Sequence, residues 1–267
     1  MRIALTGADG RIGRAVRPAL LRAGHELHST DLRTAAPLDA CERWSTGNLL
    51  DSDHVDRVLE GADAVVHFGG NSNEQPLPQI LANNHQALFE LYEGARRQRV
   101  KRVILASSNH AFGLHSTTRK LRLNDAYRPD CFYGLSKVWG EALGRMYWEK
   151  HGIECVALRI GTFMNAPPRN RRELATWLGI DDLHQLVNKS LEAEAVGFAP
   201  VWGVSANTRA WVDLDETNAI GYEPKQDAEA FAADAMSASA EPDPVADRYQ
   251  GGRFVTIDYT PDESRPG

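Results

Sequence analysis

The stretch "TGADGRIG", residues 6–13, decides the fold of this chain. It closes a short apolar run that starts at residue 2, and a helix-like pattern over residues 11–23 follows it directly. Its three glycines are Gly7, Gly10 and Gly13. Glycines at this spacing permit a tight turn, a close approach of the backbone to a pyrophosphate, and close packing of a helix on a strand. The stretch therefore predicts a phosphate-binding turn between a first strand and a first helix.

The backbone at the start of that helix is the first candidate for contact with a phosphate. Arg11 and Ile12 occupy these positions, where unpaired N–H groups and the positive end of the helix dipole favour an anion. An ordinary β–α turn without a ligand is the alternative. The position of the glycines, directly after a short apolar strand, favours a dinucleotide site.

Beyond this loop, short apolar runs alternate with longer helical patterns. We expect strands at 2–7, 25–31, 63–70, 102–108 and 154–161, and helices near 11–23, 52–60, 79–99 and 133–151. Such alternation predicts parallel strands joined by crossover helices. The expected fold class is α/β, a Rossmann-type doubly wound parallel sheet with a small C-terminal substrate-binding portion.

The alternating pattern ends near residue 162, so we divide the chain into three regions. We expect a dinucleotide-binding core with its catalytic helix at 1–162, a small substrate-binding portion at 163–240, and a tail at 241–267. Within the second region, "DDLHQLVNKSLEA" predicts a helix capped by Asp181, and "APVWGVSAN" predicts a late strand. "AEAFAADAMSASA" predicts a last helix, and the Pro- and Gly-rich tail is expected to pack loosely.

Composition excludes several classes of protein. The 267 residues are 42% hydrophobic, enough to bury a core, and carry a net charge of −6 without a basic tract, which argues against a nucleic-acid surface. Three scattered cysteines indicate a reducing compartment, with neither a disulfide framework nor metal-ligand spacing, so no metal is expected. No apolar run resembles a secretion signal or a membrane span. We expect a cytoplasmic protein.

An acidic residue ends the second expected strand. Asp31 stands 18 residues after Gly13, where a carboxylate accepts hydrogen bonds from ribose hydroxyls and repels a 2′-phosphate. This favours NAD over NADP, although Arg33 could soften the preference by pairing with a phosphate. Asn48 and Leu49, in "GNLLD", could seat the adenine or form an ordinary loop.

Two further groups extend the expected cofactor site. "VVHFGG" ends a strand with Phe68, Gly69 and Gly70, where small residues let a cofactor lie against the edge of the sheet. Ile160, near the end of the strand expected at 154–161, is assigned to the same site.

The segment "FYGLSKVWGE" places Tyr133 and Lys137 four residues apart on an expected helix, and therefore on one helical face. Ser108 lies at the end of the preceding strand, in "SSNH", where open α/β sheets bind ligands. An amphipathic helix face is the alternative for the tyrosine and lysine taken alone.

The early glycine loop, the serine and the Tyr-x-x-x-Lys segment together resemble the extended short-chain dehydrogenase/reductase superfamily. The resemblance implies that Tyr133 is the proton acceptor, that Lys137 binds the nicotinamide ribose and lowers the pKa of the tyrosine, and that Ser108 positions the substrate oxygen. A free phenol titrates near pH 10, so a lowering by about 3 units requires roughly 4 kcal/mol from nearby positive charge.

"NHQALFELYEGARRQRVKRV", which begins at Asn84, resembles a further segment of the superfamily. Ala87 and Glu90 replace a glycine and an asparagine of that segment. Asn84 could touch the cofactor or hold the backbone of the active site.

Several strings resemble one subgroup, the uronate dehydrogenases. They are "HFGGNSNEQP", "LASSNHAFG", "YGLSKVWGE", "RIGTFMNAPPRNRRELATW" and "PVWGVSAN". The resemblance extends to about residue 230 and implies oxidation of C1 of glucuronate or galacturonate by NAD to an aldarolactone. It implies a sugar pocket lined by Ser72, Ser108, Asn109, His110, Tyr133, Thr162 and Arg172.

An arginine in the loop "PPRNRRE" is expected to grip the substrate carboxylate, because an anionic ligand of an acidic protein needs a local, bidentate cation. Arg172 is the choice by its distance to "LATW", with Arg169 and Arg171 as alternatives. A solvated basic loop is the less favoured interpretation of the three arginines. His110 could act as a second acid/base or as a hydrogen-bonding wall, and Ser72 could merely cap a loop.

Two other functions stay open at this point. One is a sugar-nucleotide epimerase or reductase, against which the short C-terminal half argues. The other is a non-catalytic dinucleotide-sensing protein, which would often lack the tyrosine or lysine. The only partners expected are a small uronic acid and further copies of the chain in a homo-oligomer.

Overall fold

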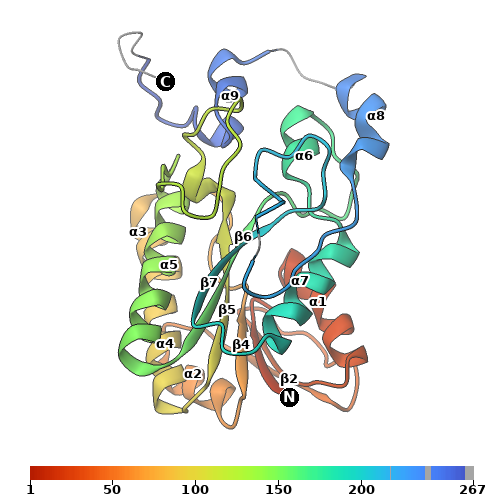
Figure 1. Cartoon of the computed structure of the whole chain (residues 1–267). Helices are drawn as coiled ribbons and strands as arrows, with labels where there is room; N and C mark the ends of the chain where they lie inside the picture. Colours follow the sequence, from red (N-terminus) through yellow and green to blue (C-terminus); the bar gives the residue numbers. More distant parts are fainter. Residues whose placement is uncertain (217, 238–241, 262–267) are drawn as a thin grey trace.

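Parallel strands form a single seven-stranded sheet in the computed structural model of this chain, which describes residues 1–216, 218–237 and 242–261 (Figure 1). The strands are β1 (Arg2–Thr6), β2 (Glu26–Asp31), β3 (Glu42–Thr46), β4 (Ala64–His67), β5 (Arg102–Ser108), β6 (Glu154–Ile160) and β7 (Phe198–Gly203). Their spatial order is β3-β2-β1-β4-β5-β6-β7, and every neighbouring pair is parallel. The order reverses between β1 and β4, which is where doubly wound sheets bind ligands.

Helices and helical turns connect the strands. They are α1 (Arg11–Arg22), α2 (Ser52–Leu59), α3 (Leu77–Ile80), η1 (Leu81–Gln86), α4 (Ala87–Arg97), η2 (Asn109–Phe112), α5 (Phe132–His151), α6 (Arg171–Thr176), α7 (Ile180–Glu192), η3 (Ala228–Phe231), α8 (Ala232–Ser237), α9 (Pro244–Arg248) and η4 (Gly252–Phe254). Among these described helices, none combines the length and apolar character that a membrane span requires.

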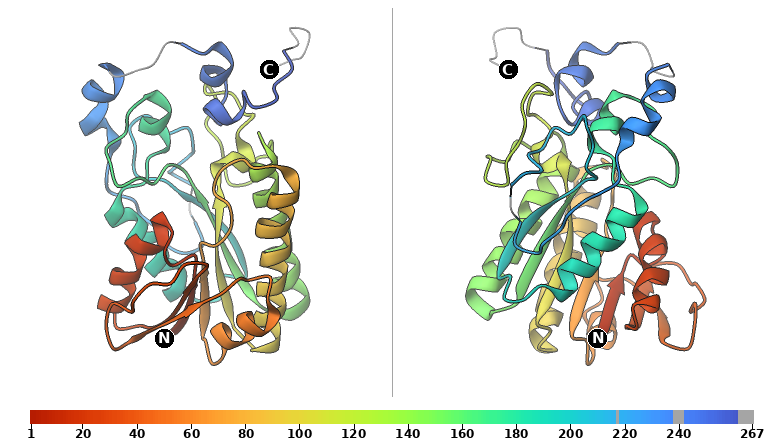
Figure 2. Two further views of the ribbon diagram at one scale, coloured as in Figure 1. Left: turned by 180° about the vertical axis from the view of Figure 1, so that it is seen from behind. Right: turned by 45° about the vertical axis from the view of Figure 1, so that its right-hand side comes forward.

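Two apolar layers hold the sheet, because alternate residues of a strand point to opposite faces. Ile3 and Leu5 pack with side chains of α1 and α7, whereas Ala4 packs with side chains of α2, α4 and α5. Figure 2 shows the helices divided between the two faces in the same way. The expected Rossmann-type doubly wound α/β fold is confirmed.

Most expected elements are present, with differences at their edges. The helix expected near 79–99 is three pieces, because a π-helical turn, η1, separates α3 from α4. The strand β3, which precedes Asn48, is not among the strands expected above; it is polar and partly exposed. Residues 228–237 form η3 and α8, and residues 238–240 of that expected helix lie outside the described residues.

Asp181 does not cap α7, so that prediction is wrong. The helix begins at Ile180 after Gly179, which has no side chain to offer. Gln226 caps the helix instead, because its Oε1 accepts from the backbone N–H groups of Asp181 and Asp182 at 3.0 and 3.3 Å. A cap supplied from 44 residues away along the chain leaves no local sequence signal.

The expectation of a loosely packed tail is wrong for residues 249–255. Tyr249 and Val255 are 7% and 2% exposed. The backbone N–H groups of Gln250 and Gly251 donate to the carbonyls of His115 and Gly113, both at 2.9 Å. These contacts anchor the segment after α9 to the loop that follows β5, at the end of the molecule where Figure 1 shows α9.

Candidate active site

The carboxyl ends of β5 and β6 and the N-terminus of α5 meet at one place, and there the expected catalytic residues come together. Ser108 ends β5 and Tyr133 opens α5, where both are buried. A hydrogen bond links the Ser108 hydroxyl to the Tyr133 phenol. The Lys137 ammonium lies 5.4 Å from the centroid of the Tyr133 ring and donates to the Ala106 carbonyl at 2.9 Å. Serine, tyrosine and lysine thus form one cluster, as expected.

The direction of the tyrosine pKa differs from the expectation. Burial raises the pKa of Tyr133 to about 12, and the hydrogen bond from Ser108 only partly opposes this. Burial also lowers the pKa of Lys137 to about 8, because a low-dielectric site disfavours the ammonium. The lysine therefore does not by itself make the phenol acidic.

The turn η2 carries two polar side chains beside this cluster. Ser108 caps the turn by accepting from the N–H of His110 at 3.2 Å. Asn109 is 8% exposed, and its Nδ2 has no hydrogen-bond partner among the described residues. A buried amide donor without a partner is costly, so a ligand oxygen at this point would be favourable.

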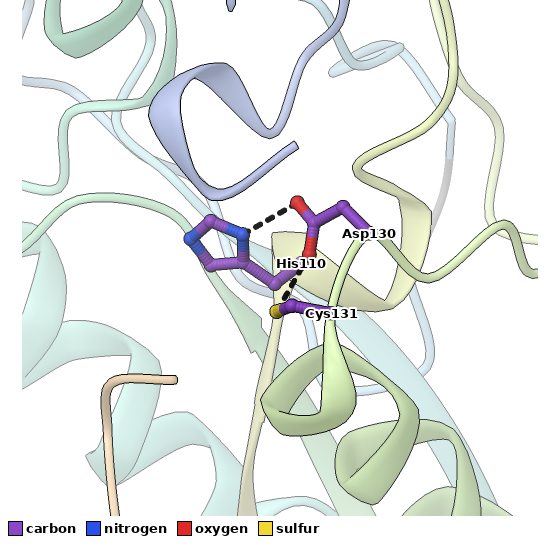
Figure 3. Close-up of side chains that lie close together, drawn as sticks. All are labelled: His110, Asp130 and Cys131. Carbon is purple, nitrogen blue, oxygen red and sulfur yellow. Dashed lines mark hydrogen bonds and ion pairs between the residues drawn. The ribbon is translucent and has the colours of Figure 1, made fainter. Parts of the chain in front are cut away.

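His110 is held by a carboxylate from the loop before α5. Its Nδ1 lies 2.7 Å from Oδ2 of Asp130, and the other oxygen of Asp130 accepts from the thiol of Cys131 at 2.9 Å (Figure 3). Burial lowers the pKa of His110, although Asp130 acts in the opposite direction. A neutral imidazole that donates through Nδ1 presents Nε2 as an acceptor.

The three residues of Figure 3 have ligand atoms within 4.8 Å of one another, a spacing that a metal ion could use. The hydrogen bonds already satisfy the same atoms. Burial and the neighbouring Asp130 raise the pKa of the Cys131 thiol, which opposes the thiolate that a metal requires. The cluster is therefore explained by hydrogen bonding, and the absence of a metal stays a prediction.

Glycines enclose the Asp130 carboxylate. A Cβ at Gly113 or Gly251 would collide with Oδ2 of Asp130, and one at Gly134 would collide with the His110 carbonyl. Side chains at these positions would displace the carboxylate from the imidazole. Gly251 belongs to the tail, so the tail helps to place Asp130.

Arg172 enters the site from α6. Its Nη1 donates to the Thr162 hydroxyl at 3.3 Å, its Nη2 lies 3.4 Å from Nε2 of His110, and its Nε donates to the Gln250 carbonyl at 2.8 Å. Across the described residues, no carboxylate lies within ion-pair distance of this largely buried guanidinium. Burial lowers its pKa, against the attraction of Asp130.

The other two arginines of the loop are placed differently. Arg169 pairs with Glu173 at 3.0 Å, with its side chain 67% exposed, and Arg171 is exposed. Among the three, the geometry favours Arg172 for an anionic ligand.

The tail lies against the side chains of this cluster. The ring of Phe254 lies 4.1 Å from the His110 ring and 6.3 Å from the Tyr133 ring, measured between centroids. A Cβ at Gly252 would lie 2.6 Å from Cδ of Arg172, so this backbone also fits closely around the arginine. The segment from Gln250 to Phe254 thus forms one wall of the site.

At the other end of the site, the glycine loop has the shape that a dinucleotide needs. Gly7 has φ of +67°, and a Cβ on it would lie 2.5 Å from the carbonyl of Phe68. A Cβ on Gly13 would collide with the Gly7 carbonyl. Gly10 leaves the first turn of α1 without a side-chain cap, and no acidic residue stands in that turn. These features fit a pyrophosphate bound through backbone N–H groups.

Asp31 ends β2 beside this loop. Its Oδ2 accepts from the N–H of Asp9 at 3.0 Å, and its Oδ1 accepts from the N–H of Leu32 at 2.8 Å. Both carboxylate oxygens keep lone pairs for ribose hydroxyls.

The remaining expected residues have varied surroundings. Asn48 caps its own loop by accepting from the N–H of Leu50 at 3.0 Å, and a Cβ on Gly69 would lie 3.3 Å from Leu49. Ser72 is exposed in the loop after β4. The remaining expected cofactor residues are Arg11 and Ile12 at the start of α1, Phe68 and Gly70 after β4, and Ile160 at the end of β6.

Asn84 is part of the framework. It lies in η1, accepts from the N–H of Asn71 at 2.7 Å, and donates to the Asn71 carbonyl and to Ser136, both at 3.0 Å. These bonds tie the loop after β4 to the catalytic helix. They favour the structural interpretation over direct contact with a cofactor.

Sequence reasoning missed Asp130, Phe254 and Glu74. The Glu74 carboxylate accepts from the N–H groups of Phe132 and Tyr133 at 3.1 and 2.7 Å, which places a negative charge at the N-terminus of α5. Each of these residues contacts a partner in the site that lies at least 20 positions away in the sequence. No local sequence pattern therefore predicts the contact. The string "QGGRF", residues 250–254, also resembles the uronate dehydrogenases and includes Phe254.

The chain is similar to known proteins over most of its length. Residues 3–217 match the family described as "NAD dependent epimerase/dehydratase family". A uronate dehydrogenase from Pseudomonas syringae pv. tomato is 42% identical over 95% of this chain and 93% of its own.

Two solved structures are similar over nearly the whole chain. A mutant of the uronate dehydrogenase of Agrobacterium tumefaciens, complexed with NAD, has a TM-score of 0.89 at 38% identity and covers 96% of this chain and 97% of its own. The glucuronic acid dehydrogenase of Chromohalobacter salexigens has a TM-score of 0.91 at 36% identity, with the same coverage.

Proposed function

Because the chain belongs to the NAD-dependent epimerase/dehydratase family, and within it to the uronate dehydrogenases, we propose that it oxidises glucuronate or galacturonate at C1 to the aldarolactone. The observation that supports this most is Arg172. A largely buried guanidinium without a carboxylate partner in the described part of the chain stands beside His110 and Thr162, and a uronate carboxylate supplies the missing anion.

Three residues carry the proton chemistry in this proposal. A bound NAD would supply the hydride acceptor for C1 and the positive charge of its nicotinamide. Tyr133 takes the proton of the C1 hydroxyl, Ser108 positions that oxygen, and Lys137 places its ammonium behind the phenol. To bring the pKa of Tyr133 from about 12 to near 7, roughly 7 kcal/mol of stabilisation of the phenolate is needed, which Lys137 alone does not provide.

The sugar lies, on this proposal, between η2, α6 and the tail. Its binding residues are Ser72, Ser108, Asn109, His110, Tyr133, Thr162 and Arg172. The free Nδ2 of Asn109 donates to a sugar oxygen, and Nε2 of His110 accepts from a sugar hydroxyl. His110 is thereby a binding wall and not a second base.

The cofactor follows the glycine loop to the catalytic helix. Its proposed contacts are Gly7, Gly10, Arg11, Ile12, Gly13, Asp31, Asn48, Leu49, Phe68, Gly69, Gly70, Tyr133, Lys137 and Ile160, with Asn84 supporting them through Asn71. The core at 1–162, the small substrate-binding portion at 163–240, the tail at 241–267, the homo-oligomer and the cytoplasmic location remain predictions.

The test is NADH formation by the purified protein with glucuronate, galacturonate, glucose or galactose as substrate. We expect turnover of both acids, at least 100-fold less with the neutral hexoses, and none in the Tyr133→Phe variant. Turnover of a neutral sugar but of neither acid would overturn the proposal.

A further inference from the structure

A second carboxylate lies next to Asp31, in the glycine loop itself. Asp9 pairs with two guanidinium groups, with Arg14 Nε 2.8 Å from its Oδ1 and Arg33 Nη2 3.0 Å from its Oδ2. Arg33 Nη2 also donates to the Asp9 carbonyl at 3.2 Å. The N–H of Asp9 in turn donates to Oδ2 of Asp31 at 3.0 Å.

We propose that Asp9 is a cofactor-selecting residue, which excludes a 2′-phosphate by holding Arg14 and Arg33 in its own ion pairs. Asp31 alone repels the phosphate but leaves two nearby cations to compensate for it. With Asp9 present, both cations are engaged by a carboxylate that is part of the loop. NAD, which has a ribose hydroxyl in place of the phosphate, loses nothing by this arrangement.

The charge balance of the cluster supports the proposal. Two carboxylates and two guanidinium groups sum to zero, so the cluster offers no net attraction to an anion. Asp9 is fixed, with its side chain 11% exposed, whereas the side chains of Arg14 and Arg33 are 59% and 67% exposed. Its hydrogen bond with Arg14 lowers the pKa of Asp9, which keeps it ionised at neutral pH.

Loss of the Asp9 charge would leave a net charge of +1 and two long cationic side chains free to turn. Without the Asp9 carboxylate, these two largely exposed side chains can turn toward a bound phosphate. Arg33, two residues after Asp31, is the nearer in sequence to the ribose-binding carboxylate and is the expected partner of a 2′-phosphate.

The experiment measures dissociation constants of NAD and NADP by titration of the purified, uronate-free protein. In Asp9→Asn, which preserves shape and removes charge, we expect the affinity for NADP relative to NAD to rise about tenfold. Adding Arg33→Ala to Asp9→Asn should remove most of the gain. The matched control is Asp56→Asn, which breaks a surface pair with Arg97 at 2.9 Å and should leave the ratio unchanged.

Two results would overturn the proposal. One is an unchanged ratio in Asp9→Asn when that variant still binds NAD. The other is a gain that persists in full without Arg33. If Asp9→Asn fails to fold, Asp9→Ser provides the same comparison. Because no uronate is present, failure of the substrate assignment would not affect the outcome.

Discussion

At the scale of single residues, the surroundings of Arg172 bear most directly on binding of the substrate carboxylate. Its guanidinium contacts the Thr162 hydroxyl and the His110 imidazole but no carboxylate within the described chain. We expect Arg172→Gln to raise KM for glucuronate about 10- to 100-fold, since a hydrogen bond to a charged group contributes about 1.5–3 kcal/mol. Arg171→Gln removes the same charge from an exposed neighbour, and steady-state kinetics should show little change. Equal effects in the two variants would contradict the assignment.

Asp130 provides a second prediction at this scale. Its carboxylate orients His110 so that Nε2 faces Arg172 and the proposed sugar site. Asp130→Asn replaces a charge-assisted hydrogen bond with a neutral one, so kcat/KM for glucuronate should fall about tenfold. In a His110→Ala background the same change should have no further effect, because the two residues act as a unit. Additive losses in the double variant would show that Asp130 acts independently of His110.

The sequence predicts residues well where a motif fixes them. Ser108, Tyr133 and Lys137 follow from their positions on one strand end and one helix face. Arg172 was selected from three arginines by distance to a motif, and the contacts now separate it from Arg169. The partner of His110 could not be predicted, because a contact over 20 positions depends on the path of the whole loop.

At the scale of elements, the tail is the clearest departure from expectation. Phe254 covers His110 at 4.1 Å, and Gln250 accepts from Arg172. We expect Phe254→Ala to raise KM for glucuronate about tenfold with a smaller effect on kcat, because the lost ring opens the pocket to water and frees the imidazole. Ile257→Ala, an exposed position in the same segment, is the control for kinetic measurements. A KM that stays at the wild-type value in Phe254→Ala would exclude the tail from the substrate site.

Two of the helices were predicted almost to the residue. The helices expected near 11–23 and 133–151 are Arg11–Arg22 and Phe132–His151. The strand β3 and the start of α7 were harder to predict from the sequence. β3 has little apolar pattern, and the N-terminus of α7 is capped by Gln226. The packing of the tail depends on backbone bonds to residues more than 130 positions away, which composition does not reveal.

At the scale of the whole molecule, the parallel sheet gathers its strand ends at one edge, and β1, β2, β4, β5 and β6 all contribute to the proposed site there. The architecture was predictable because the alternation of apolar runs and helices determines a doubly wound sheet. The same buried sheet contains histidines that cannot easily ionise, and this affects the stability of the entire fold.

His67 at the end of β4 is the strongest case. Its Nδ1 lies 2.7 Å from the Thr6 hydroxyl, and burial lowers its pKa to about 3. In the unfolded chain its pKa is near 6.5, so below that pH the unfolded state binds a proton that the native state does not. The stabilisation is fully present above about pH 6.5 and is lost as the pH falls toward 3.

Between pH 7 and pH 5, this linkage should cost about 2 kcal/mol of the free energy of unfolding. Urea unfolding at the two pH values should show a decrease in the wild type that is smaller by about that amount in His67→Asn. Identical decreases in the two proteins would show that His67 is not the group responsible.

In the proposed complex, one site holds a uronate between Arg172 and Tyr133. A crystal structure of the Tyr133→Phe variant with NAD and glucuronate tests it most directly. We predict the sugar carboxylate within hydrogen-bonding distance of the Arg172 guanidinium, and C1 between the nicotinamide and the ring at position 133. A carboxylate bound elsewhere, or C1 turned away from that ring, would contradict the account.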